Sequence, residues 1–307
     1  MNGLTLAQDY WESVGRPAFQ RELPGLIERM AVGLAGEGSE CFGYDDAISR
    51  DHDWGPGFCV WLTQADDQAY GSAAREIYRK LPRAFAGHPP RRELPQAGRR
   101  VGCFSIPEWC ARYVGCPGAP ASIAQWRRIP EHFLATAVNR RIFQDPVGEF
   151  SDIRRQLLAF YPEDVRRKKL AHRLAVMAQA GQYNFPRSLR RGETVAASLA
   201  LHEFMQAGMS AVYLLNRRYA PFYKWMHRGI RDLPVLPESS AVFAQLAANA
   251  DGRSQQEAVE ELCRMVVKEL LRQELSWETG SFLMPHAQLV FSGITDAELH
   301  GTHIMED

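Results

Sequence analysis

Two acidic residues separated by a single position, Asp51 and Asp53, are the strongest candidates for chemistry in this sequence. If they stand at the start of a strand, their side chains project from the same face, because strand side chains alternate. Two carboxylates on one face repel each other unless a cation lies between them. Mg²⁺ suits such oxygen ligands and keeps open positions for phosphate oxygens. The spacing therefore predicts a Mg²⁺ site formed by Asp51 and Asp53.

A glycine-containing segment precedes the two aspartates. Gly38 and Ser39 follow the apolar run Ala31–Leu34. Small residues at such a place let the backbone approach an anion closely and offer it N–H groups. We therefore expect Gly38 and Ser39 to contact phosphate.

Three side chains near the two aspartates are weaker candidates for a role in this site. His52, between the aspartates, should point away from them and serve as a hydrogen-bonded residue of the sheet face. Asp45 and Asp46 either extend the acidic pocket or cap the loop that contains them.

This arrangement resembles the signature of the nucleotidyltransferase superfamily, which has the DNA polymerase beta type of fold. That signature is an apolar strand, Gly-Ser, a further Gly, and a Ser shortly before Asp-x-Asp. The matching residues here are Gly38, Ser39, Gly43, Ser49, Asp51 and Asp53. The segment SRDHDWGP, with Arg50 inserted before the first Asp, is similar to the DUF4037 branch of that superfamily. Residues 142–162 (IFQDPVGEFSDIRRQLLAFYP) and 214–225 (LLNRRYAPFYKW) resemble helical-domain segments of the same family.

The resemblance implies a transferase that moves a nucleoside monophosphate from a nucleoside triphosphate (NTP), with ATP as first candidate, to an acceptor and releases pyrophosphate. It implies that Asp51 and Asp53 bind Mg²⁺ and act in catalysis, while Gly38 and Ser39 hold the phosphates. The acceptors of the superfamily include small molecules, proteins and RNA ends. We expect a small molecule or a protein here.

One element of the family pattern is missing. The family usually supplies a third carboxylate from a later strand, and the best candidate strand, residues 99–106, contains no acid; Glu93 and Glu108 flank it. This leaves open a nucleotide-sensing protein that binds without turnover. An antitoxin-type nucleotidyltransferase that adenylylates a partner toxin is a third possibility, although a fused helical domain fits it less well.

A basic and aromatic set in the second half is expected to contact the same nucleotide. Arg217 and Lys224 would meet the phosphates, and Tyr223 would stack on the base. Solvated helix faces and an aromatic core cluster are the alternatives. Weaker candidates of the same kind are Arg187, Arg190, Arg191 and Arg218.

The front half must supply the sheet that positions these residues. The apolar runs Ala31–Leu34, Phe58–Leu62 and Val101–Ile106 are strand-sized and bounded by Gly and Pro, and residues 67–80 have helical spacing. We therefore expect an α+β protein. A small mixed β-sheet nucleotidyltransferase-like domain with flanking helices would span 1–130.

The second half has apolar residues at the three- and four-residue steps of helices, which predicts an all-α helical bundle over 131–307. Ser254 and Glu257 have capping-box spacing and predict the start of its last long helix. Only Ala287–Phe291 is typical of a strand.

The composition limits the function classes. The 307 residues include 36 Lys+Arg and 36 Asp+Glu, a balance that disfavours a nucleic-acid partner. The six cysteines form no CxxC pair, so we expect reduced, mostly buried thiols. No apolar run approaches the roughly 20 residues of a membrane helix, and the first residues lack the apolar core of a signal peptide. We expect a cytoplasmic protein without a membrane partner.

Overall fold

The computed structural model describes residues 1–92, 98–139, 141–248 and 251–307, so Glu93 lies outside the described residues. The chain forms two compact units. Unit 1 comprises Met1–Ala121 and Phe133–Ala159, and unit 2 comprises Ser122–His132 and Phe160–Asp307. The domain border expected after residue 130 falls within the segment Ser122–His132. Among the described residues, no helix is long and apolar enough to cross a membrane.

Unit 1 contains a four-stranded mixed sheet with the strand order β3-β2-β1-β4. β1 is antiparallel to both β2 and β4, and β2 is parallel to β3. The strands expected near residues 31–34, 58–62 and 101–106 are confirmed, and so is the α+β class. The bounds are Ala31–Leu34 for β1, Cys59–Leu62 for β2, Gly102–Ser105 for β3 and Arg141–Gln144 for β4.

β4 corrects the expectation that the chain is helical from residue 131 to residue 286. This strand is short, and its side chains are exposed or half-buried, so its sequence shows no strong strand pattern. It pairs with β1 through Val32, Gly33 and Leu34, with a shift of register between Val32 and Gly33. The pairing partner, distant in sequence, fixes its conformation.

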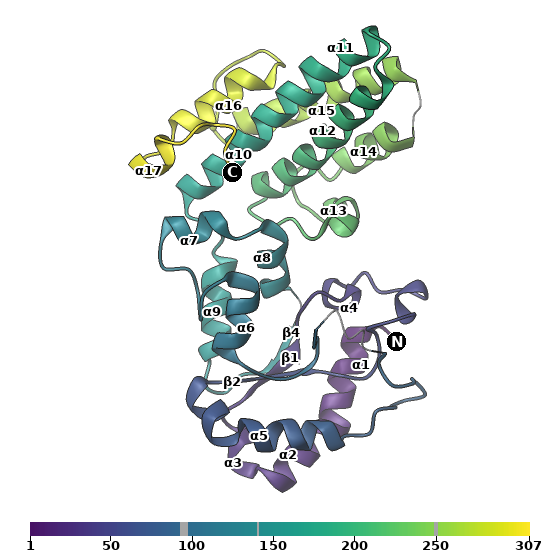
Figure 1. Ribbon diagram of the computed structural model, residues 1–307, viewed down its shortest axis with the longest axis vertical. Coiled ribbons are helices and arrows are strands. Elements are labelled where there is room, and N and C mark those ends of the chain that lie inside the picture. Colours follow the sequence, from purple (N-terminus) through teal and green to yellow (C-terminus); the bar gives the residue numbers. More distant parts are fainter. Residues whose placement is uncertain (93–97, 140, 249–250) are drawn as a thin grey trace. The chain divides into compact units, whose positions relative to one another are not determined.

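Helices cover both faces of this sheet (Figure 1). Val60 and Leu62 of β2 pack into a core with Phe19 and Ile77. The intervening Trp61 points to the other face, where its ring stacks on Phe150 at 4.3 Å between centroids. The helices of unit 1 are α1 (Gly3–Tyr10), a π-helical turn (Trp11–Gly15), α2 (Arg16–Glu22), α3 (Pro24–Ile27), α4 (Ser39–Phe42), a 3-10 turn (Ile48–Arg50), α5 (Gln64–Lys80), α6 (Ile106–Val114), most of α8 (Glu131–Val138) and α9 (Glu149–Leu158).

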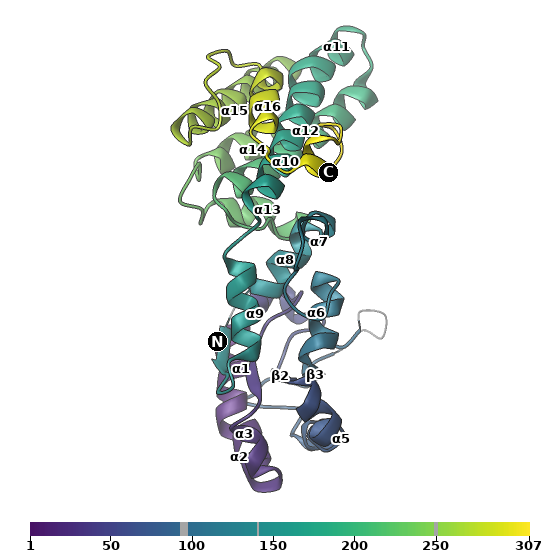
Figure 2. The same ribbon diagram turned by 90° about the vertical axis from the view of Figure 1, so that its left-hand side faces the viewer.

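The described part of unit 2 is helical. α10 packs against α12 and α16, and α14 packs against α15 (Figure 2). The elements of unit 2 are α7 (Ile123–Arg128), α10 (Glu163–Met177), a π-helical segment (Ala178–Asn184), α11 (Phe185–Arg190), α12 (Thr194–Leu215), α13 (Tyr223–Ile230), α14 (Ser239–Ala248), α15 (Gly252–Arg272), α16 (Leu283–Ser292) and α17 (Ala297–His300).

Two local expectations in unit 2 are wrong. The run Ala287–Phe291 lies in α16, because the buried residues Leu283, Ala287 and Val290 recur at helical spacing. α15 begins at Gly252, before the expected capping box. The carboxylate of Asp251 accepts a hydrogen bond from the backbone N–H of Ser254 (2.9 Å) and supplies the cap.

Candidate functional site

The glycine loop of unit 1 leads from the buried strand β1 into α4. Gly36 is clamped by the side-chain amide of Asn139: its N–H donates to Oδ1 at 3.1 Å, and Nδ2 donates to its carbonyl at 2.7 Å. Gly38 is the extended residue that precedes α4. A Cβ atom at Gly38 would lie 2.3 Å from the Glu40 carboxylate, so only glycine fits there without movement. Gly38 and Ser39 thus stand where the sequence placed them, between a strand and a helix.

Asp51 and Asp53 do not stand on a strand, which corrects that expectation. They follow the 3-10 turn, and β2 starts only at Cys59. The Asp51 side chain is 62% exposed. The Asp53 side chain is 3% exposed, its φ is 52°, and its Oδ2 lies 3.3 Å from a guanidinium nitrogen of Arg100. The two carboxylates therefore have different surroundings and do not share a strand face.

His52 also departs from expectation. Its Nδ1 lies 2.7 Å from Asp51 Oδ1, so it faces one of the aspartates. The cause is local, because without a strand the side chains of this segment do not alternate. Asp51 Oδ1 also accepts from the His52 backbone N–H at 2.8 Å.

The loop before the aspartates is closed by its own acidic residues. Asp46 Oδ1 accepts hydrogen bonds from the backbone N–H groups of Ile48 and Ser49 (2.9 and 3.0 Å), which is the capping alternative. Asp45 Oδ2 accepts from the N–H of Gly3 (2.7 Å) and from the indole of Trp54 (3.1 Å). These contacts fix the segment that carries Asp51 and Asp53.

Arg91 is a buried cation that connects α4 with the segment of Asp53 and Gly55, and the sequence analysis did not find it. Its side chain is 6% exposed, and its guanidinium lies 3.0 Å from Glu40 Oε1. It also donates to the carbonyls of Asp53 and Gly55. Burial opposes the charge of Arg91, but the Glu40 carboxylate outweighs burial and raises the Arg91 pKa. No sequence signal marks it, because Glu40 and Arg91 are far apart in the chain.

An arginine-lined cavity of about 560 Å³ lies beside Arg91 in unit 1. Two of its arginines are paired with acids of α5: Arg75 with Asp67 and Arg79 with Glu76, each at 2.7 Å. Among the residues that the structure describes, no acid lines this cavity. The arginines are Arg75, Arg79, Arg83, Arg91 and Arg99, and they are joined by Tyr10 and Tyr78.

The residues predicted in the helical half have different partners. Arg217 has a φ of 50° and pairs with Glu163 at 2.8 Å. Lys224 Nζ lies over the ring of Trp225, 5.3 Å from its centroid. Tyr223 lines a cavity of unit 2.

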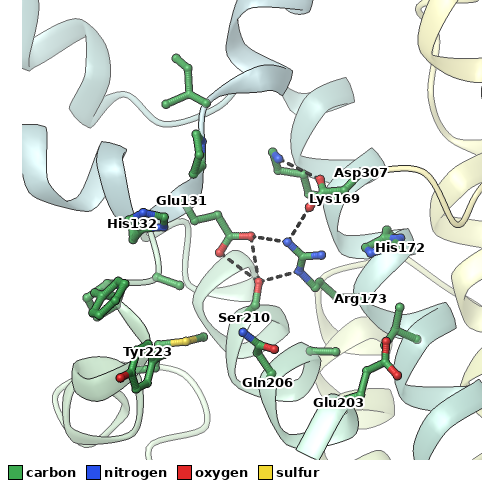
Figure 3. A pocket seen from close by; sticks show the side chains of 18 of the residues that line it. Glu131, His132, Lys169, His172, Arg173, Glu203, Gln206, Ser210, Tyr223 and Asp307 are labelled. Atoms are coloured by element: carbon green, nitrogen blue, oxygen red, sulfur yellow. Dashed lines mark hydrogen bonds and ion pairs between the residues drawn. The ribbon is translucent and has the colours of Figure 1, made fainter. Parts of the chain in front are cut away.

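This unit 2 cavity has a volume of about 630 Å³. Figure 3 shows a hydrogen-bonded network at its wall. Ser210 Oγ donates to the Glu131 carboxylate at 2.8 Å and accepts from Arg173 Nε at 2.9 Å. Arg173 also pairs with Glu131 and with Asp307, and Lys169 pairs with Asp307 at 2.8 Å. Lys169 and Arg173 are four residues apart on α10, a spacing that could have pointed to this cationic face.

The fold and these cavities define a protein with an α+β unit that has an arginine-lined cavity and a helical unit whose cavity is lined by both acids and bases. Residues 126–226 match the family described as "Domain of unknown function (DUF4037)". This match agrees with the resemblance of residues 142–162 and 214–225 to that family. A search of curated proteins found no match.

Proposed function

We propose that this protein binds an NTP in unit 1 and transfers its nucleoside monophosphate to a small-molecule or protein acceptor. The observation that carries the proposal is the arginine-lined cavity, one of whose lining residues, Arg91, pairs with Glu40 just after the glycine loop. The order of elements, from β1 through the Gly38–Ser39 loop to Asp53 and β2, supports it as well, because it follows the order that the sequence resemblance implies.

The charge of the cavity suits a triphosphate. Guanidinium groups bind phosphate oxygens through paired hydrogen bonds, and hydrogen bonds to charged groups contribute about 1.5–3 kcal/mol each. Arg83 is exposed and has no ion pair among the described residues. Arg99 is exposed and lines the same cavity, where it donates to the carbonyl of Cys103 and lies over the ring of Phe104. We therefore expect Arg83 and Arg99 to meet the phosphates.

The arrangement of Asp51 and Asp53 does not suit Mg²⁺. A metal bridging Asp51 and Asp53 needs both carboxylates on one side, but Asp51 is held by His52 and Asp53 lies against Arg100. Within the described ranges, no three His, Cys, Asp or Glu side chains form a group that could hold a metal ion. As arranged, these residues do not fit the ion, so we derive no step through it.

The same geometry favours a second candidate, an NTP-sensing protein that binds without turnover. β3 is the parallel neighbour of β2 and carries no acid between Gly102 and Ser105. A third carboxylate for activating an acceptor is thus missing from that strand. The two candidates share the binding step and differ in the release of pyrophosphate.

Binding is tested by the thermal stability of the purified protein with ATP, GTP, CTP and UTP, each with and without Mg²⁺. An NTP at a hundred times its dissociation constant should stabilise the protein by about 2.7 kcal/mol. The variants Arg83→Gln and Arg99→Gln should reduce that stabilisation. The control is Arg21→Gln, which alters an exposed arginine of α2.

Pyrophosphate release then separates the candidates. Release that depends on an added acceptor supports transfer, whereas NTP binding without release supports sensing. Equal binding by the wild type and both cavity variants would contradict the proposed NTP site.

A further inference from the structure

One wall of the unit 2 cavity holds a carboxylate between two cations, one buried and one partly buried. Lys169 Nζ lies 2.8 Å from Asp307 Oδ1, and an Arg173 guanidinium nitrogen lies 2.6 Å from Asp307 Oδ2. The side chains of Lys169 and Arg173 are 3% and 19% exposed. Burial alone would raise the pKa of Asp307, but the charges of Arg173 and Lys169 outweigh it and hold that pKa below its usual value. We call Lys169 and Arg173 the anion seat.

Lys169 and Arg173 differ in how far they rely on Asp307 to balance their charge. Arg173 has a second acid, Glu131, at 3.1 Å, but Asp307 is the ion-pair partner of Lys169 among the described residues. Arg128 lines the same cavity, is exposed, and forms no ion pair in the described ranges. A group that replaces Asp307 must therefore be anionic. A phosphate group offers more charge and more acceptor oxygens than a carboxylate, which suits Lys169, Arg173 and Arg128 together.

The opposite wall is aromatic. In Figure 3, His132 and Tyr223 lie on one side of the cavity, and Lys169 and Asp307 lie on the other. The ring of Phe222 contacts both of these rings: its centroid lies 5.7 Å from that of His132 and 4.6 Å from that of Tyr223. Phe222 and Tyr223 are 45% and 67% exposed. Accessible rings that line a cavity favour a flat ligand group that stacks on them.

We propose that the unit 2 cavity binds a small phosphorylated ligand that carries a flat ring, with its phosphate in the anion seat and its ring on the wall of Phe222 and Tyr223. Asp307 occupies the seat in the absence of that ligand and competes with it. The volume of about 630 Å³ is within the range of sites for ligands of this size. The site lies within unit 2 and does not depend on NTP binding in unit 1.

The test measures binding by calorimetry with four probes: AMP, phenyl phosphate, adenosine and inorganic phosphate. We expect AMP and phenyl phosphate to bind more tightly than adenosine or phosphate alone, and the order of the first two shows whether the ring is a nucleobase or a simple aryl group. In Asp307→Asn the internal competitor is weakened, so the binding of both phosphorylated probes should tighten by about tenfold. The control Glu257→Gln removes the same kind of charge from an exposed position of α15 and should not change binding.

Lys169→Gln in the Asp307→Asn background should weaken AMP binding by at least about tenfold. Arg128→Gln tests the same seat from an exposed residue that the fold does not need, and it should weaken binding severalfold. Arg21→Gln removes an exposed arginine of unit 1 that lines neither cavity, and it should leave this binding unchanged. Failure of the phosphorylated probes to bind the folded Asp307 variant, or binding that Lys169→Gln and Arg128→Gln both leave intact, would overturn the proposal.

Discussion

Replacing Arg91 by Met is expected to destabilise unit 1 by about 3–5 kcal/mol, the usual loss when one partner of a buried ion pair is removed. Met keeps most of the volume of the side chain but removes its charge. The Glu40 carboxylate, 3% exposed, is then left without its cation, and the carbonyls of Asp53 and Gly55 lose a donor. The double variant Arg91→Met/Glu40→Met removes both charges. It should lose less stability than Arg91→Met alone, because an apolar pair often replaces a buried ion pair at little cost.

Since the chain has two units, a single melting temperature would mix their transitions. Hydrogen–deuterium exchange read by mass spectrometry along a urea series reports peptides of unit 1 separately. Arg21→Met, at a side chain that is 70% exposed, is the control and should change stability by no more than about 0.5 kcal/mol. A double variant that loses as much stability as Arg91→Met, or more, would refute the reasoning, because it would show that the unpaired Glu40 charge is not the cause of the loss.

Three further predictions concern single positions. Gly38→Ala would place a Cβ 2.3 Å from Glu40 Oε2 and push that carboxylate from Arg91, so exchange in unit 1 should show a loss of about 1–3 kcal/mol; unchanged protection would mean that the loop adapts. Asp307 has a lowered pKa in the folded protein, so its contribution to stability is present above the unfolded value of about 3.9 and declines as the pH falls. The difference in unit 2 stability between wild type and Asp307→Asn should therefore be constant from about pH 8 to 5 and narrow below about pH 4, and a gap of equal size at both extremes would contradict this. Asp51→Asn should leave stability within about 0.5 kcal/mol of wild type, since Asp51 is exposed, and a larger loss would contradict a solvated role for this side chain.

The sheet was predictable where a strand carries its own signal. β2 is an unbroken apolar run after Gly55-Pro56-Gly57, and all its residues are buried. β1 has the same burial. β4 could not be found in this way, because it lies on the sheet edge with exposed or half-buried side chains and becomes a strand by pairing with β1. The run Ala287–Phe291 misled because it does carry a signal, but an ambiguous one: four apolar residues in a stretch of five fit either a strand or one face of a helix, and length alone does not decide.

The candidate site was predictable only in its local part. The Gly38–Ser39 turn after β1 follows from neighbouring residues. The environments of Asp51 and Asp53 do not, because Asp46 caps the preceding loop and Arg100 approaches Asp53 from a distant segment. A spacing of two residues implies a common face only on a strand, and the backbone here turns at Asp53 with a φ of 52°.

The internal acids show which cations are open to a ligand. In unit 1, Glu40 is 3% exposed and is fixed within α4, so Arg91 is committed to holding the loop. A ligand must then use Arg83 and Arg99, which are exposed, and Arg91 variants should fail by unfolding before they fail by weak binding. In unit 2, Asp307 is 32% exposed, although Lys169 beneath it is buried. Its side chain can leave without opening a packed interior, because it is already partly hydrated. The two units therefore use ion pairs differently. The pair of Arg91 and Glu40 in unit 1 is structural, and the pair of Lys169 and Asp307 in unit 2 is exchangeable.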